Sequence, residues 1–149
     1  MNISLYGLRV VRESTHRYDF EGRAISNPDD AVEMLCEIFE LDQLAEEHLV
    51  MLCLNTKHKI VGAFTVSVGT ISQSMVHPRE IFKRAIVQNS ASILLAHNHP
   101  SGDPTPSSDD YTVTTRLAEC SKLLGIEMID HLIITPTGEN YSMKANGVF

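Results

Sequence analysis

Two histidines separated by one residue, His97 and His99, are the strongest candidates for a catalytic or metal-binding role. If a β-strand continues through them, both leave the same face, roughly 6.5 Å apart at the backbone. Their ring nitrogens can then converge on one zinc ion at about 2.0–2.1 Å. Asp110 follows the helix-opening Ser107 and can bring a carboxylate to the same point. Two histidines and one aspartate leave a tetrahedral position open, which is typical of a catalytic zinc.

Each part of this constellation also has a purely structural interpretation. An isolated pair of histidines is commonly no metal site. Ser107 and Asp110 have the spacing of a helix capping box, in which both side chains satisfy free backbone N–H groups. The metal site is favoured because an apolar strand, paired histidines, a rigid loop and a helix-opening acid all occur within residues 92–110.

The segments around the histidines predict how they are positioned. The apolar run 92–96 predicts a short buried strand that leads directly into His97. Residues 99–107 contain three prolines and a glycine, so no helix or strand can pass through them. A helix is expected from about 108 to 124, with Gly125 as its C-cap.

The first half of the chain predicts a helix and a hairpin. Asn27, followed by Pro28 and two acids, is typical of a helix start, and apolar residues at helical spacing extend this helix over about 28–41. The runs 48–54 and 60–68 predict two strands of an antiparallel hairpin.

The remaining elements complete one domain. Residues 77–80 open another helix, and its inner face is expected to hold Ile81, Phe82, Ala85 and Ile86. Final strands are expected at 126–135 and 141–143. The fold class predicted is α+β, a single mixed sheet with helices packed on it.

Length, composition and charge exclude several classes of protein. A chain of 149 residues fits one domain. Its 43% hydrophobic and 21% charged residues exclude disordered and collagen-like proteins. Twelve Lys and Arg against nineteen Asp and Glu give a net charge of −7, which argues against binding nucleic acid or anionic membranes through bulk charge.

The cysteines and the N-terminus predict a cytoplasmic protein. Cys36, Cys53 and Cys120 form no CxxC pair and are expected to be small buried hydrophobes. The first residues lack the apolar core of a signal peptide, and no run approaches the 18 apolar residues of a membrane span. We therefore expect neither secretion nor membrane association.

The block 97–110 resembles a known family. It matches the JAMM pattern of MPN-domain metallopeptidases: HxH, seven residues, Ser, two residues, Asp. Its sequence, HNHPSGDPTPS, is similar to that of the RadC family in particular. Four further segments agree with RadC: Gly69-Thr70, Val76–Lys83, Leu124–Ile126 and Asp130-His131. The resemblance covers residues 28–149, leaves 1–27 as an N-terminal extension, and implies the three-layer MPN/JAB architecture, similar to cytidine deaminases.

The resemblance also implies roles for individual residues. His97, His99 and Asp110 match the zinc ligands, and Ser107 matches the serine that helps to stabilise the oxyanion. The general base of JAMM enzymes is a glutamate just before the first core strand, where Glu47 stands immediately ahead of His48. Glu46 remains the rival for this role, because consecutive strand residues point to opposite faces and only one can face the zinc.

The resemblance thus implies a zinc-dependent hydrolase that cleaves a peptide or isopeptide bond through a zinc-activated water. Its partner would be a peptide or protein whose identity the sequence does not specify. Two other functions stay open: a DNA repair or recombination role, and a non-catalytic MPN binding module. A zinc deaminase is excluded by motif, since HxE and PCxxC are both absent.

Residues near these motifs receive mainly structural interpretations. His77 and Arg79 lie at a helix start and are expected to cap it or to face solvent. Asp103 is expected to shape the loop through its own hydrogen bonds rather than to ligate the metal. For Asp130 and His131 two interpretations stay open: a structural pair in the core, or a pair that supports the metal ligands.

Overall fold

The computed structural model describes residues 3, 7, 11–12, 14–15, 23–72 and 76–149. Its elements, in chain order, are α1 (Pro28–Phe39), β1 (His48–Leu54), β2 (Ile60–Val68), α2 (Pro78–Val87), β3 (Ser92–Asn98), α3 (Ser108–Leu124), β4 (Glu127–Ile134) and β5 (Asn140–Ser142). The strands form one sheet in the order β2-β1-β3-β4-β5. β3 and β4 are parallel, and the other neighbouring pairs are antiparallel.

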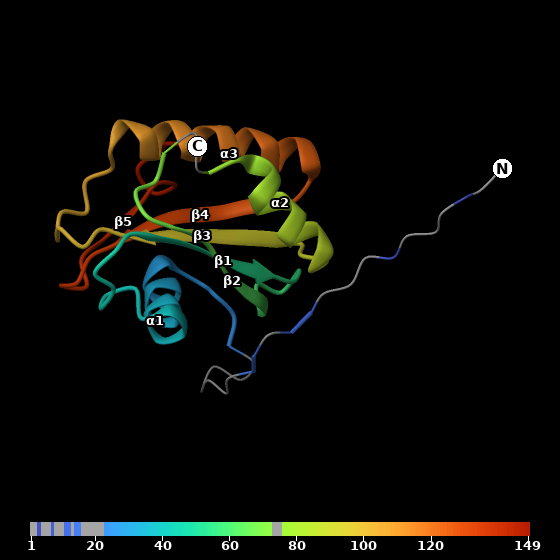
Figure 1. Ribbon diagram of the computed structural model, residues 1–149, viewed down its shortest axis with the longest axis horizontal. Helices are drawn as coiled ribbons and strands as arrows, with labels where there is room; N and C mark the ends of the chain where they lie inside the picture. Colours follow the sequence, from blue (N-terminus) through green and yellow to red (C-terminus); the bar gives the residue numbers. More distant parts are fainter. Residues whose placement is uncertain (1–2, 4–6, 8–10, 13, 16–22, 73–75) are drawn as a thin grey trace.

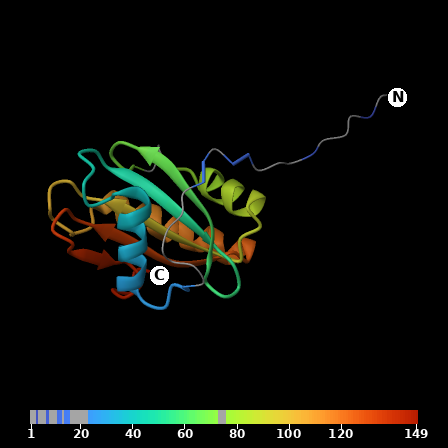
Figure 2. The same cartoon turned by 90° about the horizontal axis from the view of Figure 1, so that it is seen from below.

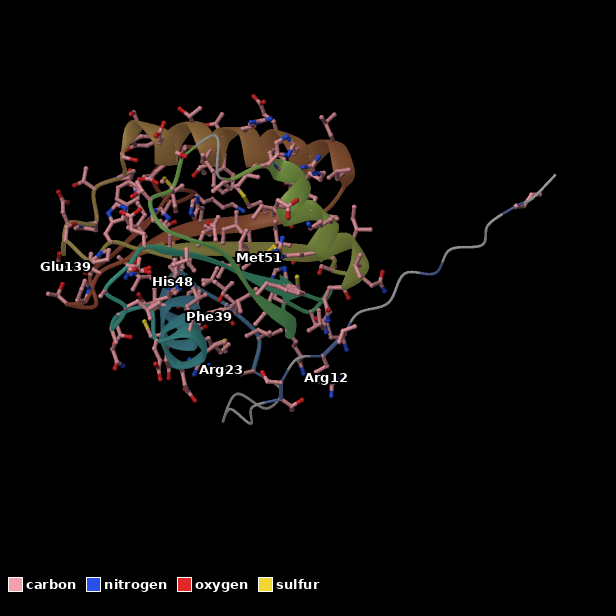
Figure 3. All side chains as sticks on the ribbon, viewed as in Figure 1. Arg12, Arg23, Phe39, His48, Met51 and Glu139 are labelled. Atoms are coloured by element: carbon pink, nitrogen blue, oxygen red, sulfur yellow. The ribbon has the colours of Figure 1, made fainter. Side chains whose placement is uncertain are left out.

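Helices cover both faces of this sheet and make three layers (Figures 1 and 2). On one face α1 contributes Met34 and Leu35 to a buried cluster. On the other face α2 and α3 pack over a second cluster that includes Met51, Leu95 and Leu117. Side chains fill the space between the sheet and the helices on both sides (Figure 3). The predicted class, a single α+β domain with a mixed sheet, is confirmed.

The position of each strand in the sheet explains its sequence. β1 and β3 are central and covered on both faces, so every residue of β3 and all but the first of β1 are buried. Such strands are continuous apolar runs. β2 lies at the edge and alternates, with Phe64 and Val66 packed against the core. The predicted antiparallel hairpin of β1 and β2 is confirmed.

The helix ends follow from their capping residues. Asn27 caps α1, because its side chain accepts the N–H of Asp30 at 2.9 Å. α1 ends at Phe39 rather than at 41, since Glu40 is left-handed with φ 55° and its N–H bonds to the carbonyl of Cys36. α3 has the predicted bounds and ends at Gly125, with φ 68°.

One prediction for α2 is wrong. Ile81, Phe82 and Ala85 are buried as expected, but Ile86 is 53% exposed. At 100° per residue, Ile86 lies about 90° around the helix from the centre of the buried stripe. His77 is the N-cap of α2 and accepts the N–H of Arg79 at 3.1 Å, so the predicted capping role is confirmed.

The N-terminal extension predicted for 1–27 lies mostly outside the described residues. Ile25 is buried in the α1 cluster and donates its N–H to the carbonyl of His58 at 3.1 Å. All three cysteines are free thiols: Cys53 is buried, whereas Cys36 and Cys120 are half-buried. Within the described segments, every helix is too short or too polar to cross a bilayer.

The topology brings three distant segments to one edge of the sheet. β3, α3 and β4 form a βαβ unit, so the end of β3 lies near the start of α3. Because β1 is antiparallel to β3, its beginning lies there too, with Leu49 paired to His97. Side chains from the end of β3, the start of α3 and the start of β1 can therefore contribute to one site.

Candidate metal centre

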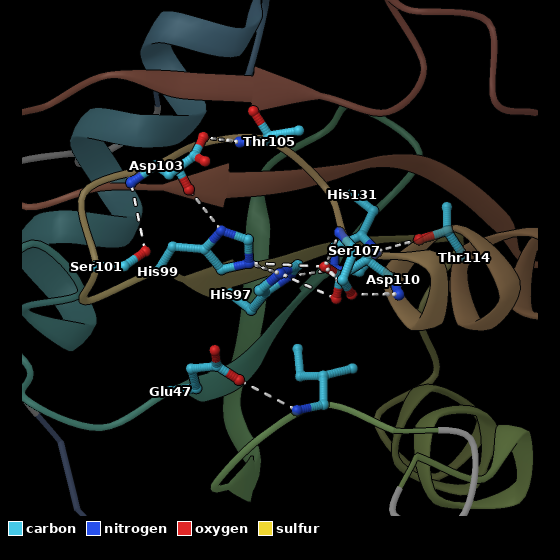
Figure 4. Close-up of polar contacts among 11 residues, drawn as sticks. Glu47, His97, His99, Ser101, Asp103, Thr105, Ser107, Asp110, Thr114 and His131 are labelled. Carbon is cyan, nitrogen blue, oxygen red and sulfur yellow. Dashed lines mark hydrogen bonds and ion pairs between the residues drawn. The ribbon is translucent and has the colours of Figure 1, made fainter.

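β3 supplies the first two residues of the centre. Strand conformation continues to Asn98, so His97 lies in the strand and His99 directly after it. The two Nε2 atoms lie 3.0 Å apart (Figure 4). His97 is fully buried, whereas His99 is half-buried. The predicted convergence of the two imidazoles is therefore present.

The N-terminal turn of α3 supplies a carboxylate to the same point. Asp110 Oδ1 lies 3.3 Å from Nε2 of His97, and Oδ2 lies 3.6 Å from Nε2 of His99. In a tetrahedral site with metal–ligand bonds near 2.0–2.1 Å, the ligand atoms lie about 3.3–3.4 Å from one another. The observed distances of 3.0, 3.3 and 3.6 Å, with one carboxylate oxygen near each histidine, lie close to this size.

Within the described ranges, these three residues are the one group of His, Cys, Asp or Glu whose ligand atoms all lie close enough for a shared ion, within 4.8 Å of one another. The donors are two imidazole nitrogens and a carboxylate oxygen, a set that divalent transition metals accept. The residues present therefore fit a metal ion.

Ser107 and Asp110 form a capping box as well as part of the centre. The Asp110 N–H donates to Ser107 Oγ at 3.1 Å, and the Ser107 N–H donates to Asp110 Oδ2 at 2.7 Å. The Ser107 hydroxyl also donates to Oδ2, at 2.6 Å. These bonds occupy Oδ2 and leave Oδ1 facing His97. The capping box therefore orients the carboxylate that the metal site needs, and the two interpretations do not compete.

The proline-rich loop fixes the tautomer of His99. Its Nδ1 lies 2.7 Å from the backbone carbonyl oxygen of Asp103. A carbonyl only accepts hydrogen bonds, so Nδ1 carries the proton and Nε2 of the neutral ring is free to ligate. The Asp103 carboxylate accepts the N–H of Thr105 at 2.9 Å, and hydrogen bonding with Thr105 lowers the pKa of Asp103. Asp103 thus shapes the loop, as predicted.

His131 of β4 contacts the far side of His97. Its Nε2 lies 2.9 Å from Nδ1 of His97, and its Nδ1 lies 2.7 Å from the hydroxyl of Thr114 on α3. Burial, and then the neighbouring His97, hold the pKa of His131 well below its ordinary value, so the ring is neutral. His131 therefore contacts a residue of the metal site, which favours the interpretation that it supports a metal ligand.

Asp130 has a different role from its neighbour. One carboxylate oxygen accepts the backbone N–H groups of His131 at 2.7 Å and of Lys144 at 3.1 Å, and the other accepts the hydroxyl of Ser142. These bonds join β4 to the segment around β5. Asp130 is therefore structural, and only His131 of this pair reaches the centre.

The charges of the three metal-site residues differ. Burial alone raises the pKa of Asp110, but the hydrogen bonds with His97 and His99 outweigh it and hold that pKa far below its usual range. Burial lowers the pKa of His97, whereas the hydrogen bond with Asp110 raises the pKa of His99. At neutral pH the carboxylate is ionised and His97 is neutral, which are the forms that bind metals.

Glu47 lies beside this centre, just before β1. Together with His99, Ser107 and Asp110 it lines a pocket of about 230 Å³. Its Oε2 accepts the N–H of Ile71 at 3.2 Å (Figure 4). The Glu46 side chain is exposed and lies outside the pocket lining. The structure thus brings Glu47 to the candidate site, whereas its role as a base stays a prediction.

Asn98 is a site residue that the motif does not single out. As the next strand residue after His97 it points to the opposite face. Its Oδ1 accepts the N–H of His48 at 2.7 Å, and its Nδ2 donates to the carbonyl of Glu46 at 2.9 Å. Asn98 therefore fixes the backbone on both sides of Glu47. The sequence offered one signal for this role, a polar residue in a buried strand. It could not identify the partners of Asn98, because they lie about 50 positions away.

Comparison with known proteins extends the likeness beyond the motif. Residues 25–148 match the RadC-like JAB domain family. A UPF0758 protein of Clostridium kluyveri is 48% identical over 130 residues, which cover 87% of this chain and 56% of the relative. A UPF0758 protein of Caldanaerobacter subterraneus subsp. tengcongensis is 45% identical over 129 residues, covering 87% and 54%.

A third relative, a UPF0758 protein of a Geobacillus species, is 48% identical over 119 residues, which cover 79% of this chain and 52% of the relative. The chain thus spans about half the length of the curated relatives it matches. The resemblance expected from the block 97–110 is confirmed, and the chain belongs to the RadC-like JAB domain family.

Proposed function

We propose that this domain is a zinc-dependent hydrolase of the JAMM type, which cleaves a peptide or isopeptide bond in a protein substrate. One observation carries the proposal: Nε2 of His97, Nε2 of His99 and the Asp110 carboxylate converge at tetrahedral spacing beside a pocket that Glu47 lines. Two nitrogens and one oxygen from the protein leave a fourth position for water or substrate, as catalytic zinc sites do.

The residues around the site divide the chemistry between them. A bound zinc ion would polarise the scissile carbonyl and lower the pKa of a water molecule. Glu47 is placed to accept a proton from the attacking water and to return it to the leaving amine. Because the Ile71 amide holds Oε2 of Glu47, Oε1 is the oxygen available for this transfer.

Ser107 is placed to stabilise the developing oxyanion. Its side chain lines the same pocket and is exposed to an incoming substrate. The hydroxyl can turn toward the substrate without leaving Asp110 Oδ2 unpaired, because that oxygen keeps the backbone N–H of Ser107. One donor aimed at an oxyanion typically contributes about 2.7–4 kcal/mol to transition-state stabilisation.

The proposed partner is a peptide or protein segment rather than nucleic acid. The net charge of −7 opposes binding to phosphate backbones. An amide carbonyl needs only a metal, an oxyanion donor and a base around it, and the residues that would supply these groups lie at the pocket. Because the chain spans half of its relatives' length, the proposal concerns the chemistry of this domain.

Cleavage by the zinc-loaded chain tests this proposal. The protein is incubated with mixed peptides and with peptides branched through lysine ε-amides, and products are identified by mass spectrometry. We expect cleavage that stops when a chelator removes the metal and returns when zinc is added. A zinc-saturated chain that cleaves neither kind of bond would contradict the proposal and favour the non-catalytic binding module.

Replacing Asn98 with alanine is expected to slow this cleavage by up to about 100-fold. The variant loses the hydrogen bonds that hold the backbone on both sides of Glu47, and a small misplacement of a reacting group can lower the rate by that factor. Stability should also fall by about 1–3 kcal/mol, since the N–H of His48 and the carbonyl of Glu46 lose a buried partner. Urea unfolding and the cleavage rate at saturating zinc measure the two effects.

Asn55→Ala provides a matched control. Asn55 likewise bonds two backbone groups through its side chain, accepting the N–H groups of Lys57 at 2.9 Å and Lys59 at 3.1 Å, but it lies in the turn between β1 and β2. This variant should lose stability and keep its cleavage rate. Equal rates in both variants would show that Asn98 has no influence on Glu47.

A further inference from the structure

A chain of three buried side chains continues from the metal centre into the core. His97 Nδ1 lies 2.9 Å from Nε2 of His131, and His131 Nδ1 lies 2.7 Å from Oγ1 of Thr114. All three side chains are inaccessible to solvent, each with a relative exposure of 0%. They come from β3, β4 and α3, so each element of the βαβ unit contributes one member (Figure 4).

The protons in this chain can be arranged in two directions, because each neutral imidazole has one N–H donor and one acceptor nitrogen. In one direction Thr114 donates to His131, which donates to His97, and the proton of His97 sits on Nε2. In the other direction His97 donates from Nδ1 to His131, and His131 donates from Nδ1 to Thr114. Only the second direction leaves Nε2 of His97 with a free lone pair.

We propose that His131 is a positioning residue for metal binding, an inference that rests on the proposed function. Its unprotonated Nε2 accepts the Nδ1–H of His97, which leaves Nε2 of His97 free to bind a metal ion together with Asp110 and His99. Thr114 makes this possible by accepting the remaining N–H of His131, which is buried away from bulk solvent. Thr114 thus supports the tautomer of His131 that accepts from His97, and His131 in turn supports the tautomer of His97 with its proton on Nδ1.

The direction of these hydrogen bonds affects the charge of the site. Metal-binding histidines commonly donate to a carboxylate, a backbone carbonyl or water. Here His97 would donate to a neutral imidazole and His99 donates to the carbonyl of Asp103. Neither histidine then donates its Nδ1–H to a negatively charged group. The negative charge near the site comes instead from the carboxylates that line the pocket, those of Asp110, Glu47 and Asp103. A bound ion would therefore keep more of its Lewis acidity than one whose histidine ligands donate to carboxylates.

Zinc affinity of full-chain variants tests the proposal. Groups that support a metal ligand typically change metal affinity 10–100-fold. We expect His131→Phe to raise the Kd for zinc by that factor, and Thr114→Val by about 10-fold. Thr114→Ser keeps the hydroxyl and should restore wild-type affinity. Competition with a chromophoric chelator measures each Kd, and circular dichroism establishes which variants are folded.

Thr115→Val is the matched control. Thr115 lies next to Thr114 on α3, is exposed, and donates its hydroxyl to the carbonyl of Tyr111 at 2.9 Å. It should bind zinc as the wild type does. A purely structural role for Thr114 and His131 would lower stability without changing zinc affinity. Thr114→Val replaces a buried hydroxyl with a methyl of similar volume, so it decides the matter if His131→Phe does not fold.

The tautomers provide a second, independent readout. In long-range ¹H–¹⁵N spectra of the zinc-loaded wild type, we expect the proton of His97 and that of His131 on Nδ1. A proton on Nε2 of His131, or a Kd within twofold of wild type in folded Thr114→Val, would overturn the positioning role. A wild type that binds zinc but hydrolyses nothing would contradict only the hydrolase, whereas one that binds no zinc would overturn both.

Discussion

Glu47→Gln is expected to bind zinc as tightly as the wild type and to lose about 10²–10⁴-fold in hydrolysis rate, the usual contribution of a general base. Glutamine has the shape of glutamate, and its amide oxygen can still accept the N–H of Ile71. It cannot take a proton from water at neutral pH. The rate at saturating zinc and the Kd for zinc, measured on the same preparation, separate the two effects.

Glu46→Gln is the natural control, because it makes the same change at the adjacent position. The Glu46 side chain is exposed and lies outside the pocket lining, and only its backbone carbonyl is held by Asn98. This variant should therefore keep the wild-type rate. A loss of rate in Glu46→Gln with an unchanged rate in Glu47→Gln would assign the base to Glu46 instead of Glu47.

Asp110→Asn is expected to weaken zinc binding by at least about 100-fold, more than changes to groups that only support a ligand. The substitution removes the one anionic member of the triangle formed with His97 and His99. The amide oxygen can still accept the backbone N–H of Ser107, so α3 should keep its cap. Titration with zinc against a competing chelator measures the loss.

Asp109→Asn makes the same change one residue earlier in the first turn of α3. It should cost about 0.3–1 kcal/mol of stability by removing a favourable interaction with the helix dipole, and it should leave zinc affinity unchanged. Similar zinc affinities in Asp110→Asn and Asp109→Asn would show that the Asp110 carboxylate does not bind the metal.

The sequence predicts most of the fold, because the signals for its elements are local. The runs 48–54 and 60–68 match β1 and β2 residue for residue, since an apolar run and an alternating run each end at a turn. Helices α1, α2 and α3 begin directly after their N-cap residues, which are Asn27, His77 and Ser107. The errors are also local. Ile86 is apolar but lies beyond the buried stripe of α2.

The convergence of the metal-site residues is predictable for the same reason. His97 lies in β3 and His99 directly after it, and Ser107 and Asp110 lie at the start of α3, so short spacings determine both pairs. Asn98 and His131 depend instead on the order and register of strands. Only the parallel pairing of β3 with β4 places His131 behind His97, 34 positions away. No spacing within one segment encodes such a contact.

The zinc content of the purified chain shows whether His97, His99 and Asp110 form a metal centre. Elemental analysis is made on the wild type and on the double variant His97→Ala/His99→Ala, after zinc is added at neutral pH and excess is removed. We expect about one zinc per chain in the wild type and none in the double variant. A wild type without zinc, or a double variant that keeps it, would contradict a metal centre at His97, His99 and Asp110.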